Sequence, residues 1–168
     1  MPPRPRRFMP GVVMAAPALT IRSFHPADTG AVVDLWHRCG LVRPHNDPLK
    51  DIARKMRVRP DLFLVGLLDG APVASVMIGY EGHRGWINYL AVSPDHQKRG
   101  FGRLIMEEAE RRLQAEGCPK INLQVRTSNA AVLAFYHALG YAQDEVISLG
   151  KRLVPDGPPP ANTPGGSA

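Results

Sequence analysis

The residue types best suited to chemistry form a basic, glycine-punctuated loop within residues 90–103, which read LAVSPDHQKRGFGR. An apolar strand passes here through a loop into the start of a helix. Gly100 and Gly102 let backbone N–H groups approach an anion without an intervening Cβ, and the helix start adds partial positive charge. Three side chains add full charges: Lys98, Arg99 and Arg103. The loop favours phosphate binding, although glycine geometry alone explains many such turns.

A second set of candidate residues lies on and just before a helix whose apolar stripe includes Phe135 and Tyr136. Ser128 is the expected cap of this helix, and Asn129 beside it is a capping residue by the same rule. A tyrosine on an apolar stripe is as readily a core residue as a proton donor. The helix pattern alone therefore leaves both roles open for Tyr136.

The elements that position these residues follow from hydrophobic periodicity and turn signals. Strands are expected at 19–24, 62–68, 71–80, 86–92, 121–125 and 141–149, and helices at 26–40, 48–56, 101–116 and 128–140. Asp47 caps the second helix, Asp69-Gly70 marks a hairpin, and Gly117 ends the third helix. This order predicts an α/β fold with a single mixed sheet flanked by helices.

Composition describes one domain with an ordinary core: 168 residues, of which 44% are hydrophobic and 21% charged. The net charge is +6, but three arginines lie in the Pro-rich start, which leaves 18 basic against 15 acidic residues. Only 7% of residues are aromatic, and these lie in apolar patterns rather than among basic residues. The charge therefore argues against a nucleic-acid partner.

The domain is expected to span residues 19–154, between flexible tails at 1–18 and 155–168 that are rich in Pro, Gly, Ser and Ala. Met14 is an alternative start. The N-terminus imitates a signal peptide, but prolines interrupt a short apolar stretch, and no run is long enough to span a membrane. We expect a cytoplasmic protein. Cys39 and Cys118 have no partners at metal-ligand spacing, so neither zinc nor a disulfide is expected.

Two motifs together resemble the GNAT (GCN5-related) acetyltransferases. The loop matches the family's pattern of Gln or Arg, two residues, Gly, one residue, then Gly or Ala through Gln97, Gly100 and Gly102. The segment 129–141, NAAVLAFYHALGY, is similar to the family's Asn, helix, Phe-Tyr and Leu-Gly-aromatic segment. The resemblance covers Leu19 to about Arg152.

This resemblance implies an N-acetyltransferase that transfers acetyl from acetyl-CoA directly to a primary amine, without an acyl-enzyme and without a metal. It also implies a splayed sheet in which the pantetheine arm enters between the strands that contain Val92 and Ile121. Tyr136 would protonate the departing thiolate. The implied cofactor-binding residues are Leu90, Ala91, Val92, Gln97, Lys98, Arg99, Gly100, Phe101, Gly102, Arg103 and Asn129.

The acceptor side is less defined. Family members often carry a carboxylate base on the strand over residues 86–90, WINYL, which has none. Glu81, next to the titratable His83, is the nearest candidate, with a solvated turn carboxylate as the alternative. Asn88 and Tyr89 alternate in facing, so one of them would line the acceptor cleft.

The loop between the first two helices carries two residues, Arg43 and His45, that could recognise an acidic acceptor group. An ordinary surface loop with capping residues is the alternative. Small amines, amino acids and protein amines all remain open as acceptors. The oligomeric state, which includes a homodimer, is open as well. The competing class is a sensor that binds acyl-CoA without turnover, since fold does not fix function.

Overall fold

The chain forms one open, mixed sheet between helices, described in a computed structural model over residues 18–156. The strands lie in the order β1-β2-β3-β4-β5; neighbours are antiparallel except β4 and β5, which are parallel. The strands are β1 (Thr20–Ser23), β2 (Phe63–Leu68), β3 (Ala71–Tyr80), β4 (Gly85–Val92) and β5 (Ile121–Leu123). The helices are α1 (Thr29–Arg38), α2 (Pro48–Lys55), α3 (Phe101–Ala115) and α4 (Ala130–Ala138), with short 3-10 turns at Pro26–Asp28, Pro60–Leu62 and Pro94–His96.

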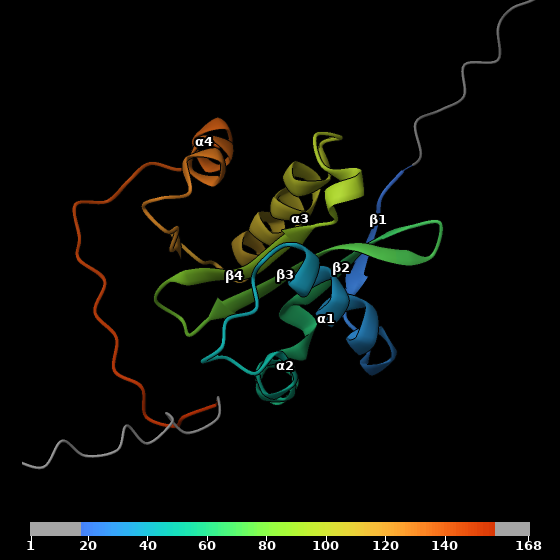
Figure 1. Cartoon of the computed structure of the whole chain (residues 1–168). Coiled ribbons are helices and arrows are strands. Elements are labelled where there is room, and N and C mark those ends of the chain that lie inside the picture. The colour runs from blue at the N-terminus through green and yellow to red at the C-terminus, as the bar shows by residue number, and fades with distance from the viewer. Residues whose placement is uncertain (1–17, 157–168) are drawn as a thin grey trace, which may run out of the picture.

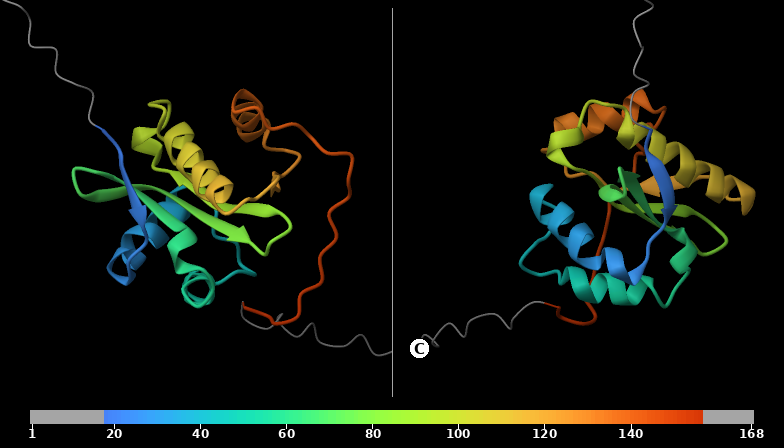
Figure 2. Two further views of the ribbon diagram at one scale, coloured as in Figure 1. Left: turned by 180° about the vertical axis from the view of Figure 1, so that it is seen from behind. Right: turned by 90° about the vertical axis from the view of Figure 1, so that its right-hand side faces the viewer.

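The predicted α/β fold is confirmed. Most of both predicted tails, residues 1–17 and 157–168, lies outside the described residues, and so does Met14. Helices α3 and α4 lie on one face of the sheet, and α1 and α2 lie on the other (Figures 1 and 2). The molecule therefore has three layers, with the sheet in the middle.

Local signals in the sequence account for several element ends. The Asp47 Oδ1 atom accepts hydrogen bonds from the backbone N–H groups of Leu49 and Lys50, at 2.9 and 3.2 Å, as an N-cap does. Asp69 and Gly70 both have positive φ, 50° and 81°, which suits a two-residue hairpin. Gly117 ends α3 in the left-handed region at φ 77°.

Each face of the sheet packs its own core because side chains alternate along the strands. Leu64 and Val76 belong to the cluster beneath α3, while Phe63 and Val65 belong to the cluster beneath α1 and α2. The second cluster contains one buried polar contact, in which Trp36 Nε1 donates to Ser75 Oγ at 2.9 Å. Central strands that are buried on both faces hold β4, and with it the candidate site, in a fixed position.

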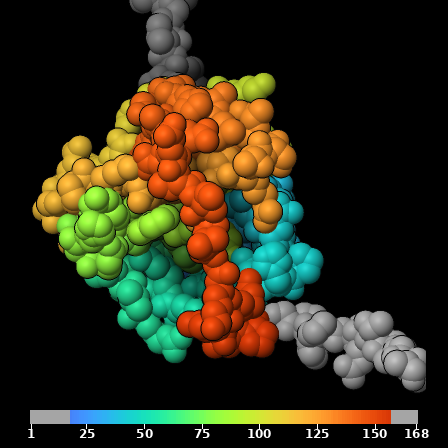
Figure 3. Space-filling view, turned by 90° about the vertical axis from the view of Figure 1, so that its left-hand side faces the viewer, coloured from blue at the N-terminus to red at the C-terminus, as the bar shows by residue number. Residues whose placement is uncertain are grey.

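The strand predicted for residues 141–149 is wrong. Residues 142–156 form no helix or strand and cross one side of the molecule as an extended segment, here called the C-terminal strap (Figure 3). Three of its apolar side chains, Val146, Ile147 and Leu149, are 78–92% exposed. Side chains, not backbone hydrogen bonds, attach the strap to residues that flank β5: Lys120 pairs with Asp144 at 2.5 Å, and Gln124 contacts Ser148. β5 has only three residues, so it offers little backbone to a further strand.

Gly85→Ala will destabilise the fold by about 1–3 kcal/mol, the cost typical of overpacking. A Cβ at this position would lie 2.8 Å from Leu113 Cδ1 and 3.0 Å from Cys118 Sγ, at the first residue of the β4–β5 pairing. Urea denaturation measures the loss. Gly79→Ala is the control, since its Cβ would meet only Trp86 Cβ, at 3.6 Å. Equal stability of both variants would contradict the prediction.

Candidate functional site

β4 and β5 pair over only part of the length of β4. The parallel register joins Gly85 to Ile121, Trp86 to Asn122 and Ile87 to Leu123, and β5 ends there. β4 continues to Val92, so its second half has no partner on this side among the described residues. The sheet is therefore splayed, as the resemblance implied. The open edge of residues 88–92 can pair with an extended ligand.

A β-bulge interrupts β4 where the two strands separate. The register with β3 shifts between Ser75 and Met77, and Tyr89 has a φ of 50°. Ile87 and Leu90 both contact the cluster beneath α3, so one extra residue lies between them. As a result Tyr89 turns toward α1 and α2, where its ring stacks on Trp36 with centroids 4.0 Å apart. Asn88 is exposed.

The loop before α3 and the first three residues of that helix present free backbone donors. Within residues 18–156, none of the backbone N–H groups of residues 97–103 donates a hydrogen bond. Lys98 and Gly100 have left-handed backbones, φ 60° and 82°. Alternation of right- and left-handed residues can direct successive N–H groups into a concavity suited to an anion. A Cβ at Gly100 would meet no atom within 4 Å, so space remains there for a ligand. The loop has the properties of a phosphate site.

The loop side chains divide into structural and free groups. Gln97 Nε2 donates to the Val92 carbonyl at 3.1 Å, and the Arg99 guanidinium lies 5.0 Å from the centre of the Phe101 ring. Phe101 is buried, so only its backbone can reach a ligand. A Cβ at Gly102 would lie 3.1 Å from the Phe135 ring, so this glycine allows α4 to approach α3. Lys98 is exposed.

The end of α1 holds the other side of this loop. Arg38 Nη2 pairs with Asp95 Oδ2 at 2.6 Å. Next to it, the Cys39 thiol donates to the Val92 carbonyl at 3.3 Å, and burial raises the pKa of this thiol. Cys39 and Cys118 are both free cysteines in the structure. The loop is thus connected to both helical layers.

Tyr136 lies on α4 against the core beneath α3, and its side chain is almost completely buried. Phe135 and Tyr141 meet its ring edge-on, with centroids 5.1 and 5.6 Å away. Burial raises the pKa of Tyr136 to about 12. Its hydroxyl has no hydrogen-bond partner among residues 18–156 and is not sealed from solvent, so it can donate to a ligand.

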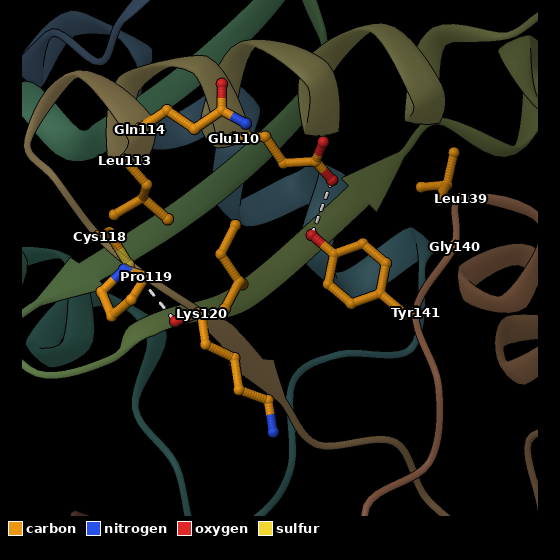
Figure 4. A pocket seen from close by; sticks show the side chains of 10 residues that line it. Glu110, Leu113, Gln114, Cys118, Pro119, Lys120, Leu139, Gly140 and Tyr141 are labelled. Carbon is orange, nitrogen blue, oxygen red and sulfur yellow. Dashed lines mark hydrogen bonds between the residues drawn. The ribbon is translucent and has the colours of Figure 1, made fainter.

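Two contacts fix the ends of α4. Asn129, not Ser128 as predicted, is the cap, because its Oδ1 accepts from Val132 N at 3.3 Å. Its Nδ2 group stays free to donate. At the other end, the Tyr141 hydroxyl donates to Glu110 Oε1 of α3 at 2.8 Å (Figure 4). The surrounding hollow of about 280 Å³ contains none of the predicted site residues.

Glu81 is not brought together with Tyr136. It lies in the turn between β3 and β4, and its carboxylate accepts a hydrogen bond from Arg84 N at 2.9 Å, which lowers its pKa. The bulge at Tyr89 follows Gly85 by four residues, or about 13 Å of strand. The turn and the open edge therefore lie at opposite ends of β4.

The carboxylate that contacts the bulge is one that sequence reasoning missed. The Tyr89 hydroxyl donates to Asp51 Oδ2 at 2.6 Å, and burial together with this bond raises the pKa of Tyr89. Asp51 belongs to α2, and Arg54 Nη1 lies 3.2 Å from its other oxygen. The spacing of Asp51 and Arg54 predicts their contact, but no sequence signal connects α2 to Tyr89.

Comparison with known proteins agrees with this geometry. Residues 30–141 match the model of the acetyltransferase (GNAT) family. The chain belongs to the GNAT acetyltransferase family. An acetyltransferase of Pectobacterium atrosepticum is 49% identical over 138 residues, which cover 82% of this chain and 98% of that protein. The resemblance in the sequence is thereby confirmed, and the chain is an acyltransferase of this family.

Two solved GNAT structures are similar to this fold. The ribosomal-protein-S18-alanine N-acetyltransferase of Escherichia coli superposes with a TM-score of 0.62 at 26% identity, covering 73% of this chain and 77% of that one. The aminoglycoside N-acetyltransferase AAC(6')-Iy in complex with CoA gives 0.67 at 18% identity, covering 85% and 100%, and shows the fold alone. In the described part of the GNAT chain, no helix is long and apolar enough to cross a membrane.

Proposed function

We propose that this protein transfers the acetyl group of acetyl-CoA to a primary amine that reaches the β4 bulge from the side of α1 and α2. The main support is the set of free N–H groups of residues 97–103, which follow the open strand edge of β4 in the chain. Gly102 closely approaches Phe135 of α4, the helix that carries the buried Tyr136 with its free hydroxyl. The GNAT family match and the CoA bound to a structural relative also support the proposal. A sensor would need no such hydroxyl.

The residues present fit CoA. The backbone of Leu90, Ala91 and Val92 would pair with the pantetheine amides along the open edge. Residues 97–103 would hold the pyrophosphate through backbone N–H groups, with charge from Lys98, Arg99 and Arg103. The Asn129 Nδ2 group would donate to the same ligand, since its Oδ1 is used in the cap. No described group of three or more His, Cys, Asp or Glu residues could hold a metal ion.

Acetyl-CoA supplies an activated thioester: the amine nitrogen bonds to the acetyl carbon, the C–S bond breaks, and the sulfur leaves as a thiolate. Tyr136 donates its hydroxyl proton to this sulfur. Transfer from a group of pKa about 12 to a thiolate, whose thiol has a pKa of about 8.5, is uphill by about 5 kcal/mol. Positioning and the developing charge on sulfur must offset this difference. Tyrosinate then recovers its proton from solvent.

The attacking amine must be neutral. Deprotonation at pH 7 costs about 4.6 kcal/mol for a lysine-like amine and about 1 kcal/mol for an α-amine. We assign proton acceptance to the Tyr89–Asp51 pair, because it lies at the bulge: the amine proton passes to the Tyr89 oxygen as the Tyr89 proton passes to Asp51. Glu81 as the base stays a prediction, disfavoured by its place in the turn.

Release of CoA thiol from acetyl-CoA tests the function, with amines, polyamines, amino acids and short peptides as acceptors. Release stimulated by one acceptor class would support transfer and identify that class. CoA binding without release for any of them would favour the sensor.

Asp51→Asn will lower kcat at pH 7 by about 100-fold for a lysine-like acceptor, the effect typical of losing a general base. Glu81→Gln is the matched control and will keep kcat within about twofold. Rates should be followed from pH 6 to 10, since the Asp51→Asn defect shrinks as the free amine forms by itself. A larger loss of kcat in Glu81→Gln than in Asp51→Asn would instead support Glu81 as the general base.

A further inference from the structure

A carboxylate of the C-terminal strap forms an ion pair with an arginine on the acceptor side of the sheet. Arg54 on α2 donates through both terminal nitrogens to both oxygens of Asp156, at 2.6 Å each. The Lys50 ammonium donates to the Asp156 backbone carbonyl at 3.3 Å. The Asp156 side chain is 5% exposed and the Arg54 side chain 43%. Arg54 therefore holds a carboxylate in the paired geometry that guanidinium groups favour.

This arginine is close to the reaction centre. Its Nη1 atom lies 3.2 Å from Asp51 Oδ1, and Asp51 Oδ2 accepts the Tyr89 hydroxyl at 2.6 Å. Only one carboxylate thus separates the guanidinium from the side chain at the β4 bulge. A hollow of about 690 Å³ opens at this place, between α2 with its preceding loop and the strap. Its lining is Asn46, Asp51, Arg54, Gly150, Lys151, Arg152, Leu153, Val154 and Asp156.

The strap closes this hollow with few interactions. No backbone–backbone hydrogen bond joins residues 142–156 to the rest of residues 18–156. Leu153 and Val154 are 84% and 62% exposed, so they add little burial. The strap runs from the α3 and α4 layer to α2 (Figures 2 and 3), where polar side chains attach it, including Arg152 on Asn46 Oδ1 at 3.3 Å. Exposed contacts such as that of Arg152 contribute little. The paired Arg54–Asp156 contact is stronger, but an incoming carboxylate would form the same two bonds with Arg54 and can therefore replace Asp156.

We propose that Arg54 binds a carboxylate of the acceptor, and that Asp156 occupies its place until the acceptor arrives. The acceptors would be amines that carry a carboxylate, such as amino acids or peptides with a free C-terminus. Lys50, Lys151 and Arg152 surround the position with positive charge. Arg43 and His45, the predicted acidic-group readers, are exposed and make no side-chain hydrogen bond within residues 18–156. This inference rests on the proposed function.

Paired acceptors test it: each α-amino acid against its α-carboxamide, and short peptides with free against amidated C-termini. The wild type will prefer the carboxylate member in kcat/KM. Arg54→Gln will lower kcat/KM for the carboxylate by about 10- to 100-fold more than for the carboxamide, as expected for a lost charged hydrogen-bond pair. Any effect through the Arg54 contact with Asp51 is common to both members of a pair and cancels in this ratio. Asp156→Asn will lower KM for the carboxylate acceptor several-fold, because it removes the carboxylate that competes with the acceptor for Arg54.

Arg57→Gln and Asp34→Asn are the matched controls, since they remove the same charges from exposed positions and will change neither member. An equal loss for carboxylate and carboxamide in Arg54→Gln, or a wild-type preference for carboxamides, would overturn the inference. If no acceptor is turned over, the proposed function fails instead. Calorimetry of the same pairs with CoA present then tests the carboxylate site by itself. Tighter binding of the carboxylate member that Arg54→Gln abolishes would support the site. Equal binding of both members would refute it.

Discussion

Gly100→Asp will reduce the affinity for CoA by more than about 100-fold. The Gly100 backbone is left-handed at φ 82°, and space for a ligand adjoins its Cα. A carboxylate there would face the phosphates that the N–H groups of residues 97–103 are expected to hold. Repulsion between these anions adds to the cost of a side chain in this backbone region, about 1–2 kcal/mol.

Isothermal titration with CoA measures the loss in Gly100→Asp. Gly82→Asp is the control, because Gly82 is also left-handed, at φ 96°, has open space around its Cβ and lies in the β3–β4 turn. It carries the same strain and charge and will bind CoA normally. Gly100→Ala separates strain from charge and will have an intermediate affinity. Normal CoA binding by Gly100→Asp would show that the phosphate lies elsewhere.

Tyr136→Phe will lower kcat by about 100-fold and leave the dissociation constant of acetyl-CoA unchanged. The ring keeps its contacts with Phe135 and Tyr141, while the only proton donor proposed for the thiolate is lost. Because burial raises the pKa of Tyr136 to about 12, the hydroxyl stays protonated below that pH. The wild-type rate will therefore show no alkaline decline from Tyr136 between pH 7 and 10.

Single-turnover rates and equilibrium binding, measured on the same preparations, separate chemistry from affinity. Tyr141→Phe is the matched control, since it removes the neighbouring hydroxyl, which is bonded to Glu110. That variant will lose about 1 kcal/mol of stability and keep its kcat. An unchanged kcat in Tyr136→Phe would remove this residue from the mechanism and strengthen the sensor alternative.

Local chemistry made much of the fold predictable. Asp47, Asp69-Gly70 and Gly117 each act on their own backbone, so the sequence near them suffices to place a helix start, a hairpin and a helix end. The loop over residues 97–103 could be proposed as a phosphate site for the same reason, since its glycines and its charges are contiguous. The splayed sheet came from the family resemblance, not from periodicity.

Contacts between distant segments were not predictable. Tyr89 meets Asp51 because a bulge reverses its facing, and tyrosine is not a residue that signals a left-handed backbone. The strap was expected to be a strand because its residues favour one, but a strand also needs a partner edge, and β5 is too short to supply it. Ser128 and Asn129 are both good caps, and only the geometry of Val132 distinguishes them.

The lengths of the strands have a consequence for association. Edge strands with unpaired backbone invite pairing with other chains, and here the two outermost strands are short, with four residues in β1 and three in β5. The longer strands, β3 with ten residues and β4 with eight, lie inside the sheet. Within residues 18–156 the stretch of β4 from 88 to 92 has no strand beside it where β5 has ended. Short outer strands thus limit edge-to-edge pairing, and a pantetheine arm bound along residues 88–92, as proposed, would also block that stretch from pairing with another chain.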